Sequence, residues 1–345
     1  MGAFAGVDLG KRKSQIVVIG SDRKVVERVK IDNDAKEFIR IFRKYKGDID
    51  VVCEASSNAF WLVDVLEPIV RSIQVGHTSK IRWIAEARIK TDNLDAGILA
   101  ELRRADLFPA ICVPPKRIRE LRELVRGQIR MRRQAVRCRN QVHGLLCRQG
   151  VGYKRSEMSG SKLGDLVRES EMPRAARIAA EAILRVEQGM QDESRQLQAA
   201  IREELKGEAE LLKLIALLES IPGVGFFSAL LFVVEIWDIT RFRDGDHLAS
   251  YIGFVPSTHQ TGQTLWHGRM TRQGNVLARW VLTQDAWTAA RTHSFFSRRY
   301  EFYRAKKGST RAIVPVARAL LNTIHRVWTE KKPYSELYEK NVLVG

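Results

Sequence analysis

The N-terminal part of the chain alternates short apolar runs with tight polar turns, and this alternation limits the possible folds more than any other feature. Three closely spaced runs come first, which is typical of an antiparallel meander. Helical and strand-like spacings then alternate, which predicts an α/β domain with a mixed sheet. We expect strands at 3–9, 15–19, 24–29, 49–53 and 73–77 and helices at 34–45 and 58–66.

Four acidic side chains fall where such a sheet and a later helix would bring them together. Asp8 ends the first strand, and Glu54 ends the first strand after the meander, which we expect to be its neighbour. Ligands usually bind at the carboxyl ends of adjacent strands in an α/β sheet. Asp92 and Asp95 lie one helical turn apart if 90–106 is a helix, so their carboxylates would share one face and close over this site.

Each of these acids also has an ordinary explanation. Asp92 and Asp95 could form a solvated face at the start of a helix, where the helix dipole favours acids. Asp8 could begin a turn, and Glu54 could cap a helix. Carboxylates held close together are nevertheless unfavourable without a positive charge between them. A hard divalent cation such as Mg²⁺, or Mn²⁺ in its place, would provide that charge.

The positive charge of the chain is concentrated in two blocks. The net charge is +18, and residues 114–155 contain 13 Lys and Arg against two acids, while residues 291–332 contain 11 against two. A charge excess of this size favours a polyanionic partner such as nucleic acid or an anionic membrane surface. Its concentration predicts two basic surfaces.

Several classes of protein are disfavoured by the sequence. The four cysteines show neither CxxC spacing nor a paired framework, so we expect no zinc site, no disulfide scaffold and a reducing cytoplasmic location. We see no signal peptide and no apolar run approaching the roughly 20 residues of a membrane span. An apolar content of 45% in 345 residues is enough for two folded domains with real cores.

Two long helical patterns follow the α/β segment. Residues 116–149 repeat apolar positions at three- and four-residue intervals, and the other faces carry arginine, which matches phosphate geometry. The alternative is the solvated face of a coiled coil, although acids are nearly absent. Residues 156–164 resemble a linker, and 173–205 predicts a coiled-coil arm for helix pairing or oligomerisation. The candidate phosphate-binding arginines of the first helix are Arg126, Arg130, Arg133 and Arg137.

Two further stretches favour DNA backbone contacts. Residues 211–237 place IPGVG between two apolar helices, where Gly223 and Gly225 would expose backbone N–H groups to a phosphate. This resembles a helix-hairpin-helix motif, and a purely structural hairpin is the alternative. Residues 251–275 are rich in hydroxyls, glycine and basic residues, which predicts a loop that presents groups to phosphate. Further candidate phosphate contacts are Arg269, Arg272, Lys306 and Lys307.

The order of the acids resembles the ribonuclease H and RuvC-like nuclease fold, in which four carboxylates hold two Mg²⁺ ions. The whole chain resembles the DEDD transposases of insertion-sequence family one hundred and ten, relatives of the Piv-type DNA invertases. The motifs that carry this resemblance span nearly the entire chain in family order. They are VDLGKRK, CEASSNAF, KTDNLDA, ESIPGVG, the GFVP…TG…TRQGN stretch and KKGSTRAIVPVARALLNTIHRVW.

The resemblance implies a RuvC-like domain at 1–155, a linker and coiled-coil arm at 156–206, and a mainly helical transposase domain at 207–345. It implies metal binding by Asp8, Glu54, Asp92 and Asp95. It also implies a hydroxyl nucleophile that links covalently to double-stranded DNA. Relatives have a serine before the loop glycine, whereas this chain has Thr261, with Ser257 as the nearest serine.

The resemblance further implies a dimer or tetramer with a site shared between protomers, and some members use a structured guide RNA. Two other functions remain compatible with the sequence. One is a metal-dependent nuclease or junction resolvase that uses the four carboxylates and water. The other is a non-catalytic DNA-binding copy of a transposase.

Overall fold

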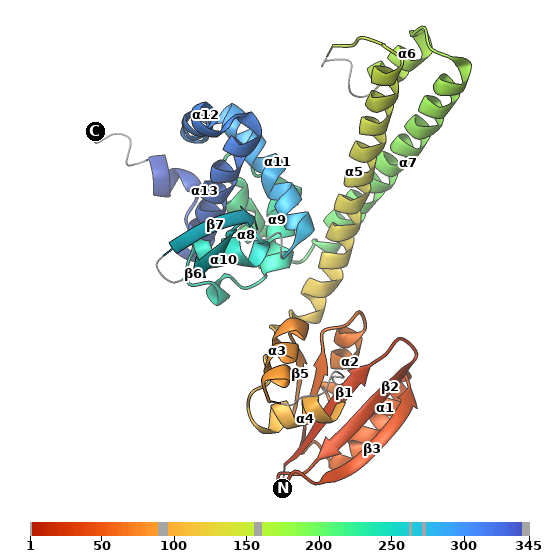
Figure 1. Ribbon diagram of the computed structural model, residues 1–345, viewed down its shortest axis with the longest axis vertical. Coiled ribbons are helices and arrows are strands. Elements are labelled where there is room, and N and C mark those ends of the chain that lie inside the picture. The colour runs from red at the N-terminus through yellow and green to blue at the C-terminus, as the bar shows by residue number, and fades with distance from the viewer. Residues whose placement is uncertain (1, 89–95, 155–160, 262–263, 271–273, 340–345) are drawn as a thin grey trace. The chain divides into compact units, whose positions relative to one another are not determined.

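The computed structural model describes residues 2–88, 96–154, 161–261, 264–270 and 274–339 (Figure 1). Contacts between residues divide the chain into two compact units, Met1–Lys116 and Arg117–Gly345. The second unit thus includes nearly all of the first long helix, whereas the domain boundary implied by the resemblance places that helix in the N-terminal domain.

The N-terminal unit contains a five-stranded mixed sheet, as the sequence predicted. Its strand order is β3-β2-β1-β4-β5. The first three strands form an antiparallel meander, and β4 and β5 continue the sheet in parallel with β1. The strands are β1 (Ala3–Leu9), β2 (Lys13–Ile19), β3 (Val25–Asp32), β4 (Ile49–Glu54) and β5 (Ser72–Gly76).

Helices cover both faces of this sheet because β1, β2 and β4 have buried apolar residues on both sides. On one face, Val7 and Cys53 belong to the same buried cluster as residues of α1 (Ala35–Phe42) and α2 (Ala59–Leu66). On the other face, α4 (Ala96–Arg104) packs on β1, β2 and β4. Gly6 permits this approach, since a Cβ atom there would overlap with the backbone of Ala96. The described part of the unit also contains α3 (Thr78–Arg88) and a short 3-10 helix at Arg43–Tyr45.

A buried carboxylate joins β4 to β5 and α4. Asp50 accepts hydrogen bonds from Arg71 at 2.7 and 3.0 Å and from Ser72, and Arg103 approaches to 3.4 Å. Burial raises the pKa of Asp50, but these bonds and the nearby charges outweigh it and hold the pKa below its ordinary value. Asp50 is therefore a fully partnered structural acid.

The Asp50→Asn substitution should destabilise the N-terminal unit by about 2–3 kcal/mol, because two arginines would lose charge-assisted hydrogen bonds in a buried place. Amide hydrogen exchange of β4 and β5 would measure the loss. Asp32→Asn is the matched control, since the exposed pair of Asp32 with Lys13 should be worth less than about 1 kcal/mol. Equal protection in both variants would contradict the expectation.

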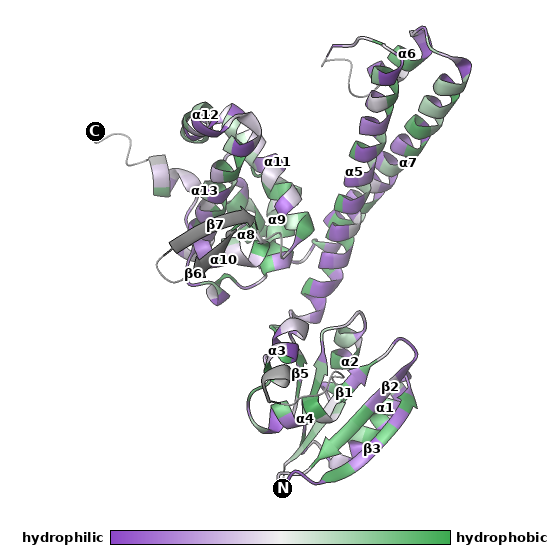
Figure 2. Ribbon diagram, in the orientation of Figure 1, coloured by the Kyte–Doolittle hydropathy of each residue, from purple (hydrophilic) through white to green (hydrophobic). Residues whose placement is uncertain are grey.

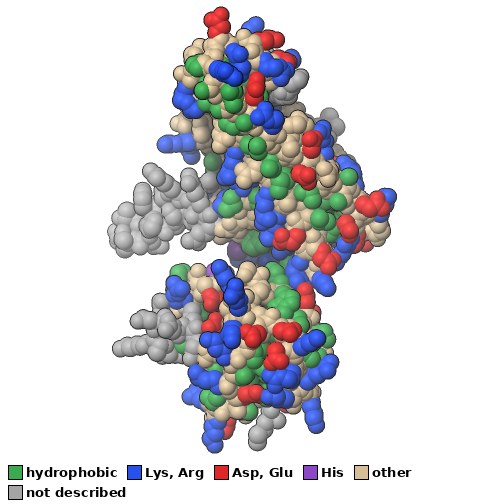
Figure 3. Space-filling model, turned by 90° about the vertical axis from the view of Figure 1, so that its right-hand side faces the viewer, with side chains coloured by type: hydrophobic (Ala, Val, Ile, Leu, Met, Phe, Trp, Pro, Cys, Tyr) green, Lys and Arg blue, Asp and Glu red, His purple; other side chains and the backbone are tan. Residues whose placement is uncertain are grey.

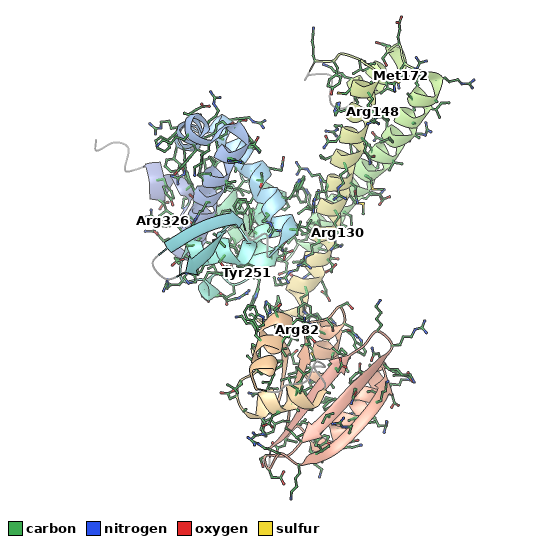
Figure 4. All side chains as sticks on the ribbon, viewed as in Figure 1. Arg82, Arg130, Arg148, Met172, Tyr251 and Arg326 are labelled. Atoms are coloured by element: carbon green, nitrogen blue, oxygen red, sulfur yellow. The ribbon has the colours of Figure 1, made fainter. Side chains whose placement is uncertain are left out.

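The second unit begins with two long helices that lie side by side, α5 (Lys116–Arg148) and α7 (Arg174–Glu204). Gln128 donates a hydrogen bond to Ser194 at 3.1 Å, and Arg139 pairs with Glu187 at 2.7 Å. Arg148 and Met172, labelled in Figure 4, lie at the far end of this pair, where α6 (Ser161–Glu169) completes a small apolar cluster. Figure 2 shows hydrophilic residues along both helices, interspersed with hydrophobic ones. The two predicted long helices are thus confirmed.

The C-terminal part packs its helices around the apolar helix α9, whose residues from Ala229 to Ile236 are all buried. Residues of α8, α10, α11 and α13 share this core. Within the described residues, no helix of the chain is long and apolar enough to cross a membrane. The elements are α8 (Ala209–Glu219), α9 (Phe226–Ile236), α10 (Gly245–Ile252), α11 (Val276–Thr292), α12 (Ser294–Lys307), α13 (Ser309–Glu330), a 3-10 helix at Ile239–Arg241 and a π-helix at Ser335–Glu339.

The stretch at 251–275 differs from the predicted loop. It contains an antiparallel hairpin of β6 (Pro256–Thr261) and β7 (Thr264–Met270), in which Thr261 pairs with Thr264. The sequence contains the reason, because two segments with threonine and a tryptophan flank a two-residue Gly-Gln connection, which is a hairpin signal. The density of polar residues had hidden this pattern.

Candidate functional site

Asp8 and Glu54 are neighbours at the carboxyl edge of the sheet. Val7 of β1 pairs with Cys53 of β4 in parallel register, and each acid is the next residue along its strand. Because side chains alternate between faces, both acids lie on the face that α4 covers. Asp8 is exposed and Glu54 is partly buried. The two acids are therefore adjacent in the sheet, as the sequence predicted.

The segments that follow the two acids are held together by asparagines. Asn33 and Asn58 both donate to the backbone carbonyl of Gly10, at 2.8 and 3.2 Å. Asn58 also accepts a hydrogen bond from Ser56 at 2.9 Å. Asn58 thus links the turn after Asp8 to the turn after Glu54, and Asn33 links the turn after Asp8 to the end of β3. Neither asparagine was identified from the sequence, although the SSN run after Glu54 was the available signal for Asn58.

Asp92 and Asp95 lie outside the described residues. Ala96 is the first described residue after them. It is in contact with Gly6, which lies two residues before Asp8 on β1. Among the described residues, no group of three His, Cys, Asp or Glu side chains could hold a metal ion. The described part of the chain thus contains two of the four carboxylates expected.

Asp8 and Glu54 have the chemistry of ligands for a hard cation. In the described ranges, no Lys or Arg forms an ion pair with either of them. By contrast, Asp50, which lies on β4 with Glu54, is paired with Arg71 and Arg103. Adjacent carboxylates without a basic partner favour a divalent cation with oxygen ligands such as Mg²⁺ or Mn²⁺. The two acids fit such an ion.

In the second unit, the base of the β6–β7 hairpin is held against α10 and α11. Gly274 has φ +109° and lies so close to Tyr251 that a Cβ atom would overlap with its carbonyl oxygen. Asn275 caps α11 by accepting from Leu277 and Ala278, both at 3.0 Å. The backbone places Thr261 and Arg269 in the two strands of the hairpin, while their side chains and Arg272 lie outside the description.

A cavity of about 440 Å³ lies beside this base, between α5 and α10. Arg130 and Tyr251, labelled in Figure 4, both line it. Arg126 forms two hydrogen bonds with Glu235, at 2.6 and 2.9 Å, and these bonds raise the pKa of Arg126. The buried Arg122 donates to the carbonyl of Val234 at the end of α9, and burial lowers its pKa. Sequence reasoning missed Glu235, which lies far from α5 in the chain.

The four candidate arginines of α5 therefore differ in their surroundings. Arg126 is engaged with Glu235, and the guanidinium carbon of Arg133 lies 5.8 Å from the centre of the Trp280 ring. Arg130 and Arg137 are exposed, and Arg137 forms only a long hydrogen bond to Gln134. Figure 3 shows basic side chains interspersed with acidic ones on the face in view. Arg130 and Arg137 are the better candidates for phosphate.

The two glycines of the IPGVG hairpin also differ. Gly223 has φ +88°, and a Cβ atom there would lie 2.6 Å from the carbonyl oxygen of Asp285 in α11. Gly223 is thus required for the close packing of this hairpin against α11. Gly225 is exposed at the N-cap of α9, and no side chain of its own caps the helix. Of the two, Gly225 is the one placed to expose backbone N–H groups.

Asp285 is a buried acid that the sequence analysis did not identify. Ser228 donates to its Oδ1 at 2.8 Å, and its Oδ2 has no hydrogen-bond partner among the described residues. Burial raises the pKa of Asp285 to about 7, although the bond from Ser228 and the charge of Arg132 oppose this. At neutral pH this carboxyl is therefore partly protonated in the folded protein.

The free energy of unfolding of the parent should fall as pH rises, because Asp285 loses its proton in a buried place. Replacing Asp285 by Asn should remove this fall. The unfolded chain loses this proton near pH 4 and the folded protein near pH 7, so parental stability falls between these values, by up to about 4 kcal/mol. Urea unfolding at pH 5 and pH 8 would measure this. The free energy of unfolding of the variant, relative to that of the parent, should be higher at pH 8 than at pH 5. The same difference between variant and parent at both pH values would contradict the expectation.

The remaining candidates, Lys306 and Lys307, lie on the exposed end of α12. The ammonium group of Lys306 lies 4.0 Å from the centre of the Phe302 ring, and that of Lys307 lies 5.5 Å from Tyr303. No carboxylate within the described residues pairs with either lysine.

Comparisons with known proteins agree with this arrangement. A transposase model of the IS110 DEDD type matches residues 5–149, and the model of the transposase IS116/IS110/IS902 family matches residues 215–301. A protein named "Putative transposase y4qE" from Sinorhizobium fredii is 25% identical over 83% of this chain and 71% of its own length. The insertion element IS116 uncharacterized 44.8 kDa protein of Streptomyces clavuligerus is 20% identical over 96% of both chains. The transposase for IS1111A of Coxiella burnetii is 34% identical over 84 residues, which are 24% of this chain and 23% of that transposase.

Proposed function

Because the chain belongs to the IS116/IS110/IS902 family of transposases, we propose that it cleaves and rejoins DNA strands at an insertion sequence. The observation that carries this proposal is the pair Asp8 and Glu54, adjacent in register and without a basic partner among the described residues. We infer that Asp92 and Asp95, which precede α4, complete a site of four carboxylates.

These carboxylates would hold Mg²⁺, or Mn²⁺ in its place. When bound, such ions activate a nucleophile and stabilise the leaving oxygen of a phosphodiester. Asp8 and Glu54 would each contribute carboxylate oxygens from a rigid strand end, and the asparagine links to Gly10 would keep the two turns in place. The sheet therefore supplies positions that are fixed before DNA binds.

In this proposal, the hydroxyl of Thr261 attacks the DNA phosphate. A bond forms between that oxygen and phosphorus while the hydroxyl proton passes to water. The bond from phosphorus to one DNA oxygen breaks, and that oxygen takes a proton from water and leaves as a hydroxyl, so that cleavage and rejoining become two steps. Thr261 ends β6, directly before the connection of the hairpin. Its β-methyl group restricts χ1 compared with a serine.

Double-stranded DNA is the proposed substrate, and its phosphates would contact the exposed basic residues of the second unit. Arg130 and Arg137 of α5 and Lys306 and Lys307 of α12 are exposed. Gly225 and the arginines of the hairpin, Arg269 and Arg272, remain further candidates. A structured guide RNA is a second polyanion that these surfaces would suit.

A dimer or tetramer is supported by apolar side chains exposed on α7. Ile178 is 54% exposed and Val186 is 51% exposed, on a helix that otherwise packs against α5. Burying such residues against a second copy would turn the helix pair into a coiled-coil arm between protomers.

The second candidate function is a nuclease or resolvase that uses only the carboxylates and water. The observation that favours it is that Asp8 and Glu54 lie in the N-terminal unit, whereas Thr261 belongs to the other unit. In that case Thr261 would play no part in cleavage.

One experiment separates these functions. The full-length protein is incubated with Mg²⁺ and end-labelled DNA that carries the junction of the insertion sequence, together with RNA transcribed from its flanks. A labelled protein–DNA adduct that survives denaturation would support the recombinase. Mg²⁺-dependent cleavage without an adduct would overturn it in favour of the nuclease, and DNA binding without cleavage would indicate a non-catalytic copy.

A further inference from the structure

A cavity in the second unit is lined by Lys307 and by none of the other candidate residues whose side chains are described. It measures about 710 Å³ and opens between α10, α12 and α13. This size is within the range of small-molecule sites. Asp8 and Glu54 are not among the residues that line it. Its aromatic and basic lining residues include Phe295, Tyr303, Tyr338, Arg299, Lys307 and Arg318.

Aromatic rings form much of the wall. Phe295 is 40% exposed, although it is a large apolar side chain on a helix of a packed domain. Tyr303 lies two turns further along α12, and Tyr338 stacks on Tyr334, with ring centres 4.9 Å apart and planes at 16°. The ring of Phe295, exposed beside the cavity, is the one suited to stacking against a nucleobase.

Cations surround the same cavity. Arg299 is held in place by donating to the carbonyl of Pro315 at 3.2 Å, and Lys307 lies over Tyr303. Arg318 pairs with Asp246 at 2.9 Å. The lining thus has three cations against one carboxylate, which favours an anionic ligand.

We propose that this cavity binds one unpaired nucleotide of a DNA or RNA strand. The base stacks on Phe295, and the adjoining phosphates lie by Arg299, Lys307 and Arg318. A base held in a duplex cannot enter, since both of its faces are already stacked and its edge is paired. The site therefore selects single strands, bulges or flipped bases, which is a property beyond strand cleavage and rejoining.

The test uses the full-length protein and oligonucleotides that carry one 2-aminopurine, whose fluorescence falls when the base stacks. The probes are a short single-stranded DNA, the same sequence as RNA, and the matching duplex. We expect quenching and tighter binding with at least one of the single strands, and the difference between the DNA and RNA probes identifies the source. Equal binding of duplex and single strands, without quenching, would overturn the proposal.

Two variants test whether single strands bind in this cavity. Phe295→Leu keeps apolar volume but removes the ring, and should weaken single-strand binding about five- to 150-fold. The matched control is Phe302→Ala, an aromatic residue of α12 that is 53% exposed and outside the cavity lining. It should leave quenching unchanged. An equal loss in both variants would place binding on the helix surface and overturn the cavity as the site.

Lys307 can be compared with a control cation, Arg298, on the same helix α12. Lys307→Gln should weaken single-strand binding and lower its salt dependence, since one phosphate contact is removed. Arg298→Gln removes the same charge from an exposed position outside the cavity lining. If both variants lose affinity equally, the attraction is a general effect of charge and the cavity is not the site.

Discussion

Replacing Asp8 by Asn is expected to slow DNA strand cleavage about 10³-fold while leaving DNA binding nearly unchanged. Asn has the same shape but lacks the negative charge, so it is a poor ligand for a hard cation. A lost metal contact of this kind is worth several kcal/mol in the transition state, and each 1.36 kcal/mol is tenfold in rate. Glu54→Gln should behave in the same way, because the two acids are adjacent in register.

The measurement is single-turnover cleavage of labelled DNA over a range of Mg²⁺ and Mn²⁺ concentrations. Asp22→Asn is the matched control, since Asp22 is an exposed acid in a turn of the same unit. It should cleave at the parental rate. The carboxylate site would be refuted if Asp8→Asn cleaved as fast as the parent while circular dichroism showed both proteins folded.

Replacing Thr261 by Ala is expected to abolish the covalent adduct and to slow strand cleavage by about 10⁴-fold or more, the scale on which other covalent enzymes lose a nucleophile. Alanine retains the β-carbon but has no oxygen to attack phosphorus. DNA binding and metal dependence should persist, because Thr261 is not among the proposed ligands. A denaturing gel with labelled DNA would measure the adduct.

Two further variants decide whether Thr261 itself acts. Thr261→Ser retains the hydroxyl and should keep or raise the yield of adduct, since serine has a freer χ1. Ser257→Ala should leave the adduct intact. Loss of adduct in Ser257→Ala but not in Thr261→Ala would move the nucleophile to Ser257. Full cleavage in Thr261→Ala would show hydrolysis by water instead.

Local patterns were sufficient to predict much of the fold. Alternating apolar residues and tight turns predicted the meander and the parallel strand β4, and so the meeting of Asp8 with Glu54. The apolar repeat predicted the long helices α5 and α7. These features succeed because strand and helix periods are visible within a short window of sequence.

The missed features depend on contacts between distant segments. Arg126 and Glu235 are 109 residues apart, so the repeat in α5 could not reveal that this arginine is engaged inside the protein. Gly223 similarly suggested a phosphate contact, while its packing against α11 depends on residues more than sixty positions later. The β6–β7 hairpin was missed for another reason, because its strands are polar. Asp92 and Asp95 stay predictions, since they lie outside the described residues.

The attachment of α5 has a consequence for how this helix pair can change in length. Arg122 and Arg126 fix one end of α5 to the end of α9, and the 33-residue helix then extends about 50 Å. Each inserted residue would turn the far end by about 100° around the helix axis, so the direction of its contacts would be lost. Seven residues restore that direction to within about 20°, provided that α7 gains the same number. Length variation in this helix pair is therefore expected in heptad steps, taken by both helices together.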